Sequence, residues 1–512
     1  MLVSGVPRVV VSALHRGCLV ALFATLLLAG CGGASDTIAS ASDAKLTSNT
    51  PGNSAFISAV RIDGTALRYL SQVRYTIQAK PGSASRPVSV SYTFDALKRR
   101  GQATEGGSRV TLPVFGLYSG YRNSVDIQLT FSDASTQRLQ ADITTATFVD
   151  PNATFDRPKV TTKRSPGSSL GFDFFYIKPL LGVPLVVDSD GELRWVGIGS
   201  ENGISSTFYD NAFIVGDQKS MKFRRLELDG TSSQSMVQSA SYRNFHHNID
   251  PGKQGLLIQV DAGSDGVVNL ESIIADVSPS GQVLKQWDFA ALLRDHMTSR
   301  GDDPSLFVRP GIDWFHTNAA TYDPRDDSLI VSSRENFVIK VDYQTGNIIW
   351  ILGDPTKYWY SFPSLRAKAL QLAGGGLYPI GQHATSITSD GLLMLFNDGT
   401  PSRNQPAGAP IGAGRTYSAV SAYAIDASTL TAREAWRFDH GQSLSAPFCS
   451  SSYEGRGKSL LVTYSGVRNG TAEVLTGLDA DHKIVFEFEY RTTGCDTVWN
   501  SQIIAFDNLT FR

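Results

Sequence analysis

Three of the eight histidines in this 512-residue chain occupy equivalent positions in a repeated pattern. His247 and His383 are each followed, nine residues later, by a short apolar run, and His316 is followed by one after thirteen residues. The four extra residues after His316 form an acidic turn, so the three positions align. An imidazole can act as a nucleophile, a proton carrier or a metal ligand near neutral pH. A repeated histidine therefore indicates one shared functional site.

Two polar residues accompany the second histidine. Asn318 lies two residues after His316, so on a strand both side chains point to the same face. Arg334 lies 18 residues after His316, at the end of the returning strand of the same hairpin. Three imidazoles, a carboxamide and a guanidinium form a donor-rich pocket suited to a tetrahedral oxyanion. A three-histidine zinc site is the alternative, since Asp250 and Asp313 are close in sequence, but Arg334 beside a divalent cation favours the anion.

The histidines are carried by a larger repeat that begins near residue 165. In each copy a β-run ends in Asp, a turn follows, and a second apolar run often carries an aromatic residue. The spacings between copies are 41, 47, 66, 84 and 53 residues, and values near 40–50 match a four-stranded propeller blade. The two long spacings indicate inserted loops. The six aspartates are Asp188, Asp229, Asp276, Asp342, Asp426 and Asp479.

This pattern predicts a six-bladed β-propeller over residues 165–512. The first strand of each propeller blade lines the central axis, so residues repeated on that strand converge. The three histidines would then meet from blades three, four and five. A second sandwich followed by a third domain is the alternative fold, because the spacing is irregular.

Residues 56–155 predict a separate β-sandwich. Apolar and polar residues alternate in several short runs that are separated by Gly, Ser and Asp, which is typical of half-buried strands joined by turns. The region contains no histidine, and we expect a structural or assembly role for it. The fold class is thus all-β, with an N-terminal β-sandwich followed by the propeller.

The first 55 residues have the pattern of an export signal and a linker. Arg8 and Arg16 precede a short apolar run that ends in Leu28-Ala29-Gly30-Cys31, which resembles a bacterial lipobox. We expect residues 1–30 to be a lipoprotein signal peptide, with lipidation of Cys31. An ordinary cleaved signal is the alternative. Residues 31–55, rich in Ser, Ala, Thr and Gly, predict a flexible tether. The mature protein would be periplasmic and would touch the membrane only through its lipid anchor.

Composition excludes several classes of protein. Charged residues make up 18% of the chain and the net charge is −2, so a nucleic-acid binder is not expected. The content of Gly, Pro and aromatic residues disfavours a helical bundle. After export only Cys449 and Cys495 remain, and we expect them to form one disulfide in an oxidising compartment.

The motifs around the histidines are similar to those of the bacterial arylsulfate sulfotransferase family, which needs no nucleotide sulfate donor. The resemblance rests on Phe245-His246-His247, Gly381-Gln382-His383, Leu395-Phe396-Asn397-Asp398-Gly399, and His316-Thr317-Asn318 with Ser332-Ser333-Arg334. Residues 112–125 also resemble the N-terminal sandwich of that family. The resemblance implies a periplasmic sandwich-plus-propeller protein, often a homodimer. It also implies transfer of a sulfuryl group from an aryl sulfate to a phenolic acceptor, without a cofactor or metal.

Residue by residue, the resemblance implies that His383 is the nucleophile and carries a transient sulfohistidine in a ping-pong mechanism. His247, His316, Asn318 and Arg334 would bind and polarise the sulfuryl oxygens. His247 is preferred to His246 because it keeps the nine-residue offset seen at His383. One departure concerns the closely spaced cysteine pair of oxidase-dependent members, because Cys449 and Cys495 are far apart. A non-catalytic, lipid-anchored propeller that acts as a scaffold or ligand binder is the competing hypothesis, alongside a hydrolytic or metal-dependent enzyme.

Overall fold

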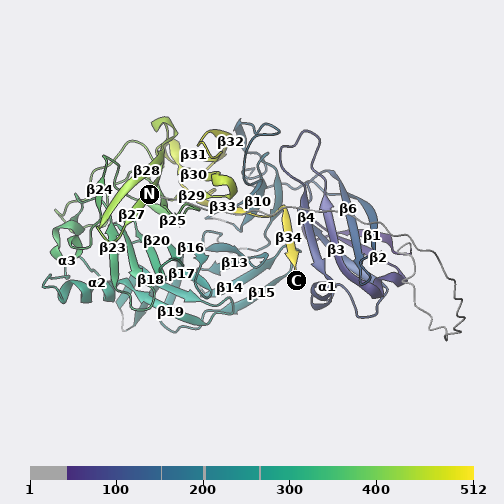
Figure 1. Cartoon of the computed structure of the whole chain (residues 1–512), viewed down its shortest axis with the longest axis horizontal. Helices are drawn as coiled ribbons and strands as arrows, with labels where there is room; N and C mark the ends of the chain where they lie inside the picture. The colour runs from purple at the N-terminus through teal and green to yellow at the C-terminus, as the bar shows by residue number, and fades with distance from the viewer. Residues whose placement is uncertain (1–42, 152, 181, 200–202, 219, 265–266) are drawn as a thin grey trace, which may run out of the picture.

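A computed structural model describes residues 43–151, 153–180, 182–199, 203–218, 220–264 and 267–512. The chain is mostly β, with an N-terminal sandwich beside a set of propeller sheets, which confirms the all-β prediction (Figure 1). The predicted signal peptide, Cys31 and the first part of the predicted tether lie outside the described residues. Within those residues, none of the helices has the length and apolar character needed to cross a lipid bilayer.

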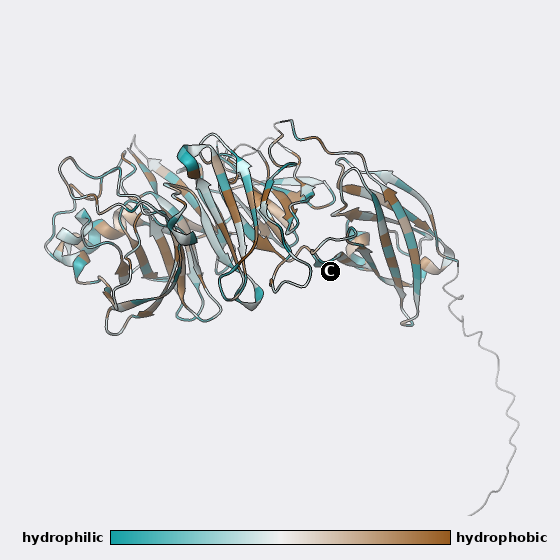
Figure 2. Ribbon diagram, turned by 90° about the horizontal axis from the view of Figure 1, so that it is seen from above, coloured by the Kyte–Doolittle hydropathy of each residue, from teal (hydrophilic) through white to brown (hydrophobic). Residues whose placement is uncertain are grey.

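The sandwich consists of a three-stranded and a five-stranded sheet. In β6 (Arg122–Phe131) alternating residues are buried between the sheets, and Figure 2 shows a corresponding alternation of hydropathy along sandwich strands. Tyr75 anchors the core, since its hydroxyl lies 3.1 Å from the Phe115 carbonyl oxygen of the facing sheet. The first sheet has the order β1 (Lys45–Pro51), β2 (Ile57–Asp63) and β5 (Arg109–Phe115). The second has the order β34 (Asn508–Phe511), β4 (Val88–Thr93), β3 (Leu70–Ile77), β6 (Arg122–Phe131) and β7 (Thr136–Thr144).

The folded chain begins earlier than the sequence predicted. Residues 31–55 were expected to be a flexible tether, yet β1 occupies Lys45–Pro51 and pairs antiparallel with β2. Most side chains of β1 are exposed, so its sequence does not show the alternating apolar residues that would mark a strand. This strand is held by backbone hydrogen bonds to an existing sheet edge, which composition alone does not reveal.

Six further sheets form the propeller region, and each contains four strands in meander order. The six hairpins predicted from the aspartate repeat join the third and fourth strands of these sheets. In order from the inner strand, the first four sheets are β33 (Asn500–Ile504), β9 (Phe174–Lys178), β10 (Leu185–Asp188), β11 (Leu193–Val196); β12 (Ser206–Tyr209), β13 (Ala212–Asp217), β14 (Lys222–Glu227), β15 (Ser232–Met236); β16 (Tyr242–Pro251), β17 (Leu256–Ser264), β18 (Val267–Val277), β19 (Val283–Asp288); and β20 (Thr317–Asp323), β21 (Ser328–Ser333), β22 (Val338–Asp342), β23 (Ile348–Leu352).

The last two sheets each gain a fifth strand at their outer edge. They contain β25 (His383–Ile387), β26 (Leu393–Asn397), β27 (Ala419–Asp426), β28 (Thr431–Phe438) and β24 (Gln371–Ala373), and then β29 (Ser451–Glu454), β30 (Leu460–Gly466), β31 (Ala472–Leu478), β32 (Ile484–Arg491) and β8 (Lys159–Thr162).

The two ends of the propeller sequence close the ring. β33, near the C-terminus, pairs with β9 as the inner strand of the first sheet. β8, just after the sandwich, pairs with β32 at the outer edge of the sixth sheet. The repeat predicted a propeller over residues 165–512. The structure differs at both ends, because β8 precedes residue 165 and β34 leaves the ring to pair with β4 of the sandwich.

The helices are short, and two of them, α2 (Phe289–Thr298) and α3 (Pro363–Arg366), lie in the inserted loops predicted from the long spacings. The largest is α2, which precedes the fourth sheet; the Asp288 side chain accepts hydrogen bonds from Ala290 N and Ala291 N at its N-terminus. The other helices are α1 (Phe94–Arg99) and α4 (Val467–Gly470), with 3₁₀ turns at Thr65–Tyr69, Tyr358–Ser361, His440–Gln442 and Arg456–Lys458.

The contact between β34 and the sandwich gives a test of how the two regions are joined. Phe511 is buried and stacks on Tyr92 with ring centroids 4.6 Å apart. We expect Phe511→Ala to destabilise the sandwich by about 3–5 kcal/mol, because a large buried ring is removed. Thermal denaturation followed by circular dichroism would show an earlier transition. Thr510→Ala, at an exposed neighbouring position, is the matched control. Equal melting temperatures for Phe511→Ala and Thr510→Ala would contradict the role assigned to Phe511.

Candidate functional site

The three repeated histidines stand at irregular points of three consecutive inner strands. His247 lies within β16, His316 directly precedes β20, and His383 begins β25. The pairing register shifts beside each of them, between His246 and Ile249, between Thr317 and Ala319, and between His383 and Ser386. His247 and His316 adopt positive φ values of 47° and 52°, which non-glycine residues rarely do. Bulges of this kind redirect side chains near functional sites.

These redirected side chains meet around one cavity of about 330 Å³. The ring centroids of His247 and His316 are 4.9 Å apart, and those of His247 and His383 are 6.4 Å apart. The predicted convergence of the three imidazoles is therefore observed. The described residues that line the cavity are His247, Asp313, His316, Arg334, His383, Arg403, Asn404, Phe448, Cys449 and Trp499.

Arg334 also reaches the cavity, as the hairpin argument predicted. It follows β21, and its backbone N–H donates to the His316 carbonyl oxygen at 3.1 Å. One nitrogen of its guanidinium, Nη1, pairs with the Glu335 carboxylate. The other, Nη2, is buried and has no hydrogen-bond partner among the described residues. An unpaired buried N–H group is costly unless a ligand accepts from it, so this nitrogen is available to an anion.

Asn318 joins two neighbouring sheets beside the cavity. It is fully buried beside the cavity rather than among the residues that line it, and its Nδ2 donates to the Gln382 carbonyl oxygen at 2.8 Å. The Ser332 hydroxyl donates to the same oxygen at 3.1 Å. Asn318 therefore braces the residue that precedes His383. This hydrogen bond joins the fourth sheet to the fifth, and the contact of Asn318 with sulfuryl oxygens stays a prediction.

The turn before His383 requires a glycine. Gly381 has a φ of 66°, and a Cβ at this position would lie 2.8 Å from the Thr400 carbonyl oxygen. The Gly381 carbonyl oxygen lies 3.1 Å from His383 Nδ1. A carbonyl only accepts hydrogen bonds, so this contact places the proton on Nδ1 and leaves the lone pair on Nε2.

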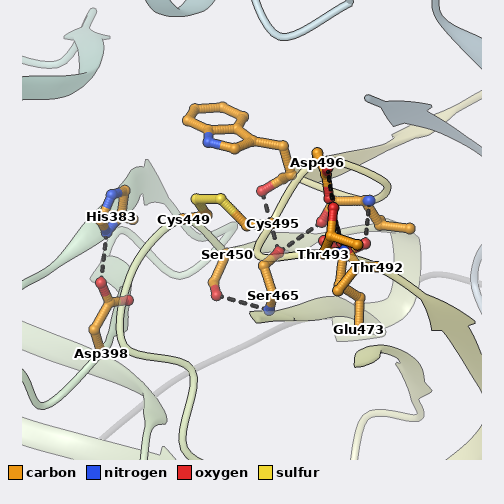
Figure 3. The surroundings of a disulfide bond; sticks show 12 residues. His383, Asp398, Cys449, Ser450, Ser465, Glu473, Thr492, Thr493, Cys495 and Asp496 are labelled. Carbon is orange, nitrogen blue, oxygen red and sulfur yellow. Dashed lines mark hydrogen bonds and ion pairs between the residues drawn. A yellow bond between two sulfur atoms is a disulfide. The ribbon is translucent and has the colours of Figure 1, made fainter. Parts of the chain in front are cut away.

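A buried carboxylate supports the same nitrogen. Asp398 Oδ2 lies 2.9 Å from His383 Nδ1, and Figure 3 shows the two side chains facing one another near the disulfide. Asp398 follows β26 within a motif that the sequence analysis quoted without giving this residue a role. Burial, together with the positive charges of Arg334 and His316, lowers the pKa of His383 well below 6.5. His383 is therefore a neutral imidazole at neutral pH.

Sequence reasoning missed the main carboxylate of the site. Glu271, on β18, lies close to three histidines: its carboxylate oxygens are 2.9 Å from His316 Nδ1, 3.2 Å from His246 Nδ1 and 3.6 Å from His247 Nδ1. Asp313, noted only for its closeness in sequence, lies 2.6 Å from His316 Nδ1. No local pattern marks Glu271, because it reaches the histidines across the third sheet. The sequence predicted a pocket of cationic and donor groups. The structure adds carboxylates to that pocket.

These carboxylates set opposite protonation states within one pocket. Burial alone would lower the pKa of His316, but the charges of Glu271 and Asp313 raise it to about 10. Burial lowers the pKa of His247 well below 6.5 despite Glu271. His246 points to Asp261, 2.7 Å from its Nε2, and its pKa rises to about 9 against the effect of burial. His247, not His246, lines the cavity, as predicted.

A metal ion is a second possible occupant by geometry alone. The ligand nitrogens of His247, His316 and His383 all lie within 4.8 Å of one another, and Glu271 forms similar groups with neighbouring residues. A protonated His316 cannot coordinate, and the Arg334 guanidinium beside it repels a cation. The donor set therefore suits an anion better than a divalent metal.

The remaining cavity wall is aromatic and is tied by the predicted disulfide. Trp499 packs against His247 with ring centroids 5.4 Å apart, and Phe448 lies on the same cavity. Cys449 and Cys495 form a disulfide, which confirms that prediction, and join the entry of β29 to the segment between β32 and β33 (Figure 3). This bond holds the aromatic wall next to the histidines.

The ion pair between His316 and Glu271 predicts a pH-dependent stability. A folded-state pKa of about 10, above the ordinary 6.5, means that the stabilisation is complete below pH 6.5 and is lost as pH rises to 10. We expect the difference in melting temperature between the parent and Glu271→Gln to shrink across that range. Thermal denaturation at several pH values measures it. Asp142→Asn removes a carboxylate that pairs with Arg122 in the sandwich, away from the histidines, so the difference in melting temperature between the parent and this variant should stay constant. A parent–variant difference that is constant between pH 6.5 and 10 would contradict the ion pair.

The disulfide prediction concerns stability. The bond between Cys449 and Cys495 closes a loop with a sequence separation of 46 residues. In the chain-entropy model, closing such a loop stabilises the folded protein by about 4 kcal/mol. We expect the free energy of unfolding of the double variant Cys449→Ser, Cys495→Ser to be lower by this amount, so that it unfolds at a lower denaturant concentration. Non-reducing peptide mapping should recover one linked peptide from the parent. Two free thiols at these positions in protein from an oxidising compartment would refute the bond.

Comparisons with known proteins agree with this geometry. Residues 173–500 match the arylsulfotransferase (ASST) family, and residues 65–147 match the arylsulfotransferase Ig-like domain. The arylsulfate sulfotransferase AssT of Escherichia coli O6:H1 (strain CFT073) is 28% identical over 339 residues, which are 52% of this chain and 54% of that protein. The alignment thus spans about half the length of this relative. The arylsulfate sulfotransferase AssT of Lelliottia amnigena is 22% identical over 509 residues, covering 78% and 81%.

Similarity to solved structures is weak. A streptogramin B lyase has a TM-score of 0.33 and 10% identity, covering 65% of this chain and 87% of its own. The β-propeller domain of Cps50 (Swd1) from Myceliophteria thermophila has a TM-score of 0.34 and 10% identity, covering 66% and 100%. Neither similarity carries an argument about this chain. The family matches cover both the sandwich and most of the propeller, and the chain belongs to the arylsulfotransferase family.

Proposed function

We propose that this protein is an arylsulfate sulfotransferase that transfers a sulfuryl group from an aryl sulfate to a phenol through a covalent intermediate on His383. The observation that carries the proposal is the fixed tautomer of His383. Gly381 O and Asp398 hold Nδ1 at 3.1 and 2.9 Å, so the free lone pair is on Nε2 in a cavity lined by His247, His316 and Arg334. Family membership supports the same chemistry.

In the first half-reaction, the Nε2 lone pair of His383 attacks sulfur while the bond from sulfur to the aryl oxygen breaks. The aryl oxide leaves with that electron pair. A phenol has a pKa near 10, so its anion is a tolerable leaving group. The protonated His316 and the free nitrogen of Arg334 can donate to oxygens on which negative charge develops. Donors of this kind contribute roughly 3–4 kcal/mol each in comparable oxyanion sites.

In the second half-reaction, the acceptor attacks the same sulfur as a phenolate, after its proton has passed to solvent, and the sulfur–nitrogen bond breaks with its electron pair returning to Nε2. The sulfated ring is formally cationic, and the carboxyl group of Asp398 beside Nδ1 can stabilise it. Storing the group on His383 lets one cavity bind donor and acceptor in turn, which gives ping-pong kinetics. The aromatic side chains of Phe448 and Trp499 offer each aryl ring an apolar surface.

The cellular location forms part of the proposal. The lipobox-like Leu28-Ala29-Gly30-Cys31 supports export and lipid attachment at Cys31. The disulfide between Cys449 and Cys495 supports an oxidising compartment such as the periplasm.

The covalent step can be tested with the donor alone. 4-Nitrophenyl sulfate without an acceptor should release a burst of about one nitrophenol per active site. The protein should gain one sulfuryl mass on His383, which an added phenol removes. His383→Asn should abolish the burst and the adduct while leaving the melting temperature nearly unchanged.

The matched control is His482→Asn, which replaces a partly buried histidine packed on Trp436. It should retain both burst and adduct. An adduct in His383→Asn, or turnover near the parent rate, would end the assignment. A loss of parent activity after chelation would instead favour the metal-dependent alternative.

A further inference from the structure

The charges around the cavity are nearly balanced. His316, Arg334 and Arg403 line it as cations. Two carboxylates, Glu271 and Asp313, contact His316 at 2.9 and 2.6 Å.

A third carboxylate, Glu335, pairs with Arg334 and accepts hydrogen bonds from Arg403 N and Asn404 N at 2.7 and 2.8 Å. Three cationic groups thus face three carboxylates.

The other titratable groups at the cavity add little charge. Burial lowers the pKa values of His247 and His383 well below 6.5, and burial raises the pKa of Asp398 well above its ordinary value. The two imidazoles are therefore neutral near neutral pH, and the Asp398 carboxyl loses its proton less readily than an ordinary aspartate. In the next layer, Lys357 interacts with the carboxylates of Glu335 and Asp354 and with the guanidinium groups of Arg334 and Arg415, so charges of both signs stand together there.

Asp313 is the carboxylate most exposed to a ligand. It lines the cavity, and its Oδ2 is engaged by His316 and by Asn404 Nδ2 at 3.3 Å. Its Oδ1 is buried and has no hydrogen-bond partner among the described residues. An ionised carboxylate only accepts hydrogen bonds, so it repels an anion unless the anion offers a proton.

A balanced pocket discriminates between anions by their charge. The desolvation cost of an ion rises steeply with its charge, and a net positive pocket is needed to offset the cost of a dianion. An aryl sulfate carries one negative charge near neutral pH. An aryl phosphate has the same shape but loses its second proton near pH 6 and then carries two. The extra charge would meet Asp313 without a matching cation.

We propose that Asp313, together with Glu271, makes this cavity selective for monoanionic sulfate esters against dianionic phosphate esters of the same shape. The proposal rests on the proposed function, because it names the feature that selects the substrate class. The two carboxylates have separate parts. The charge of Glu271 makes the largest contribution that raises the pKa of His316, so its main part is to favour that cation. Replacing Asp313 leaves Glu271 in place and shifts the balance by one positive charge.

The test uses two unreactive ligands of equal shape, phenylmethanesulfonate and phenylmethylphosphonate, with binding to the full protein measured by calorimetry. In mildly alkaline buffer the phosphonate is a dianion, and we expect the parent to bind the sulfonate at least about tenfold more tightly. Asp313→Asn should narrow this ratio by about tenfold. Asp390→Asn removes an exposed carboxylate that pairs with Lys458. It changes the net charge equally far from the cavity and should leave the ratio unchanged.

A second measurement needs no variant. In mildly acidic buffer the phosphonate regains a proton, while His316, with a pKa of about 10, stays protonated, so the parent should gain affinity for the phosphonate but not for the sulfonate. The proposal is overturned if the parent binds both ligands equally in alkaline buffer. It is also overturned if neither the pH change nor Asp313→Asn alters the ratio. A parent that shows the selectivity but gives no burst with 4-nitrophenyl sulfate would support the selectivity and refute the proposed function.

Discussion

Pairing of β33 with β9 is the contact on which the rest of the propeller depends, because it joins strands more than 300 residues apart and closes the ring of sheets. Only in a closed ring do the inner strands of the third, fourth and fifth sheets face one axis. β16 contacts β20, and β20 contacts β25. The three histidines are brought together by this closure rather than by any local element. The outer strand β8 completes the sixth sheet in the same way, and β34 continues past the ring to bind the sandwich.

Within the ring, burial and a few carboxylates give similar side chains different chemistry. His316 and His383 are both imidazoles on the same cavity, yet one has a pKa of about 10 and the other a pKa far below 6.5. The difference comes from Glu271 and Asp313 beside the first and from burial near cations for the second. A protonated donor and a neutral imidazole are thereby held a few ångströms apart at neutral pH, as the proposed transfer to His383 needs.

Positioning is supplied by contacts between neighbouring sheets. Asn318 and Ser332 on the fourth sheet donate to the carbonyl oxygen that precedes His383 on the fifth, and the Gln382 side chain donates back to Ser333 O at 2.6 Å. On the other side, the disulfide fixes the wall that carries Phe448 and Trp499. A side chain placed between a braced turn and a fixed wall, as His383 is, loses little entropy when a ligand binds.

Local patterns in the sequence were sufficient for the repeat, the fold class, the shared position of the histidines, the approach of Arg334 and the pairing of Cys449 with Cys495. Each of these depends on periodicity, on turn residues or on a small inventory of cysteines, which are properties of short segments. Only the tertiary structure decided that Glu271 contacts three histidines, that Asp398 supports His383, that Asn318 is a brace, and that β1 and β34 complete the sandwich. The physical reason is that these contacts join residues with no common local pattern. They exist only after the ring has closed and burial has set the charge of each group.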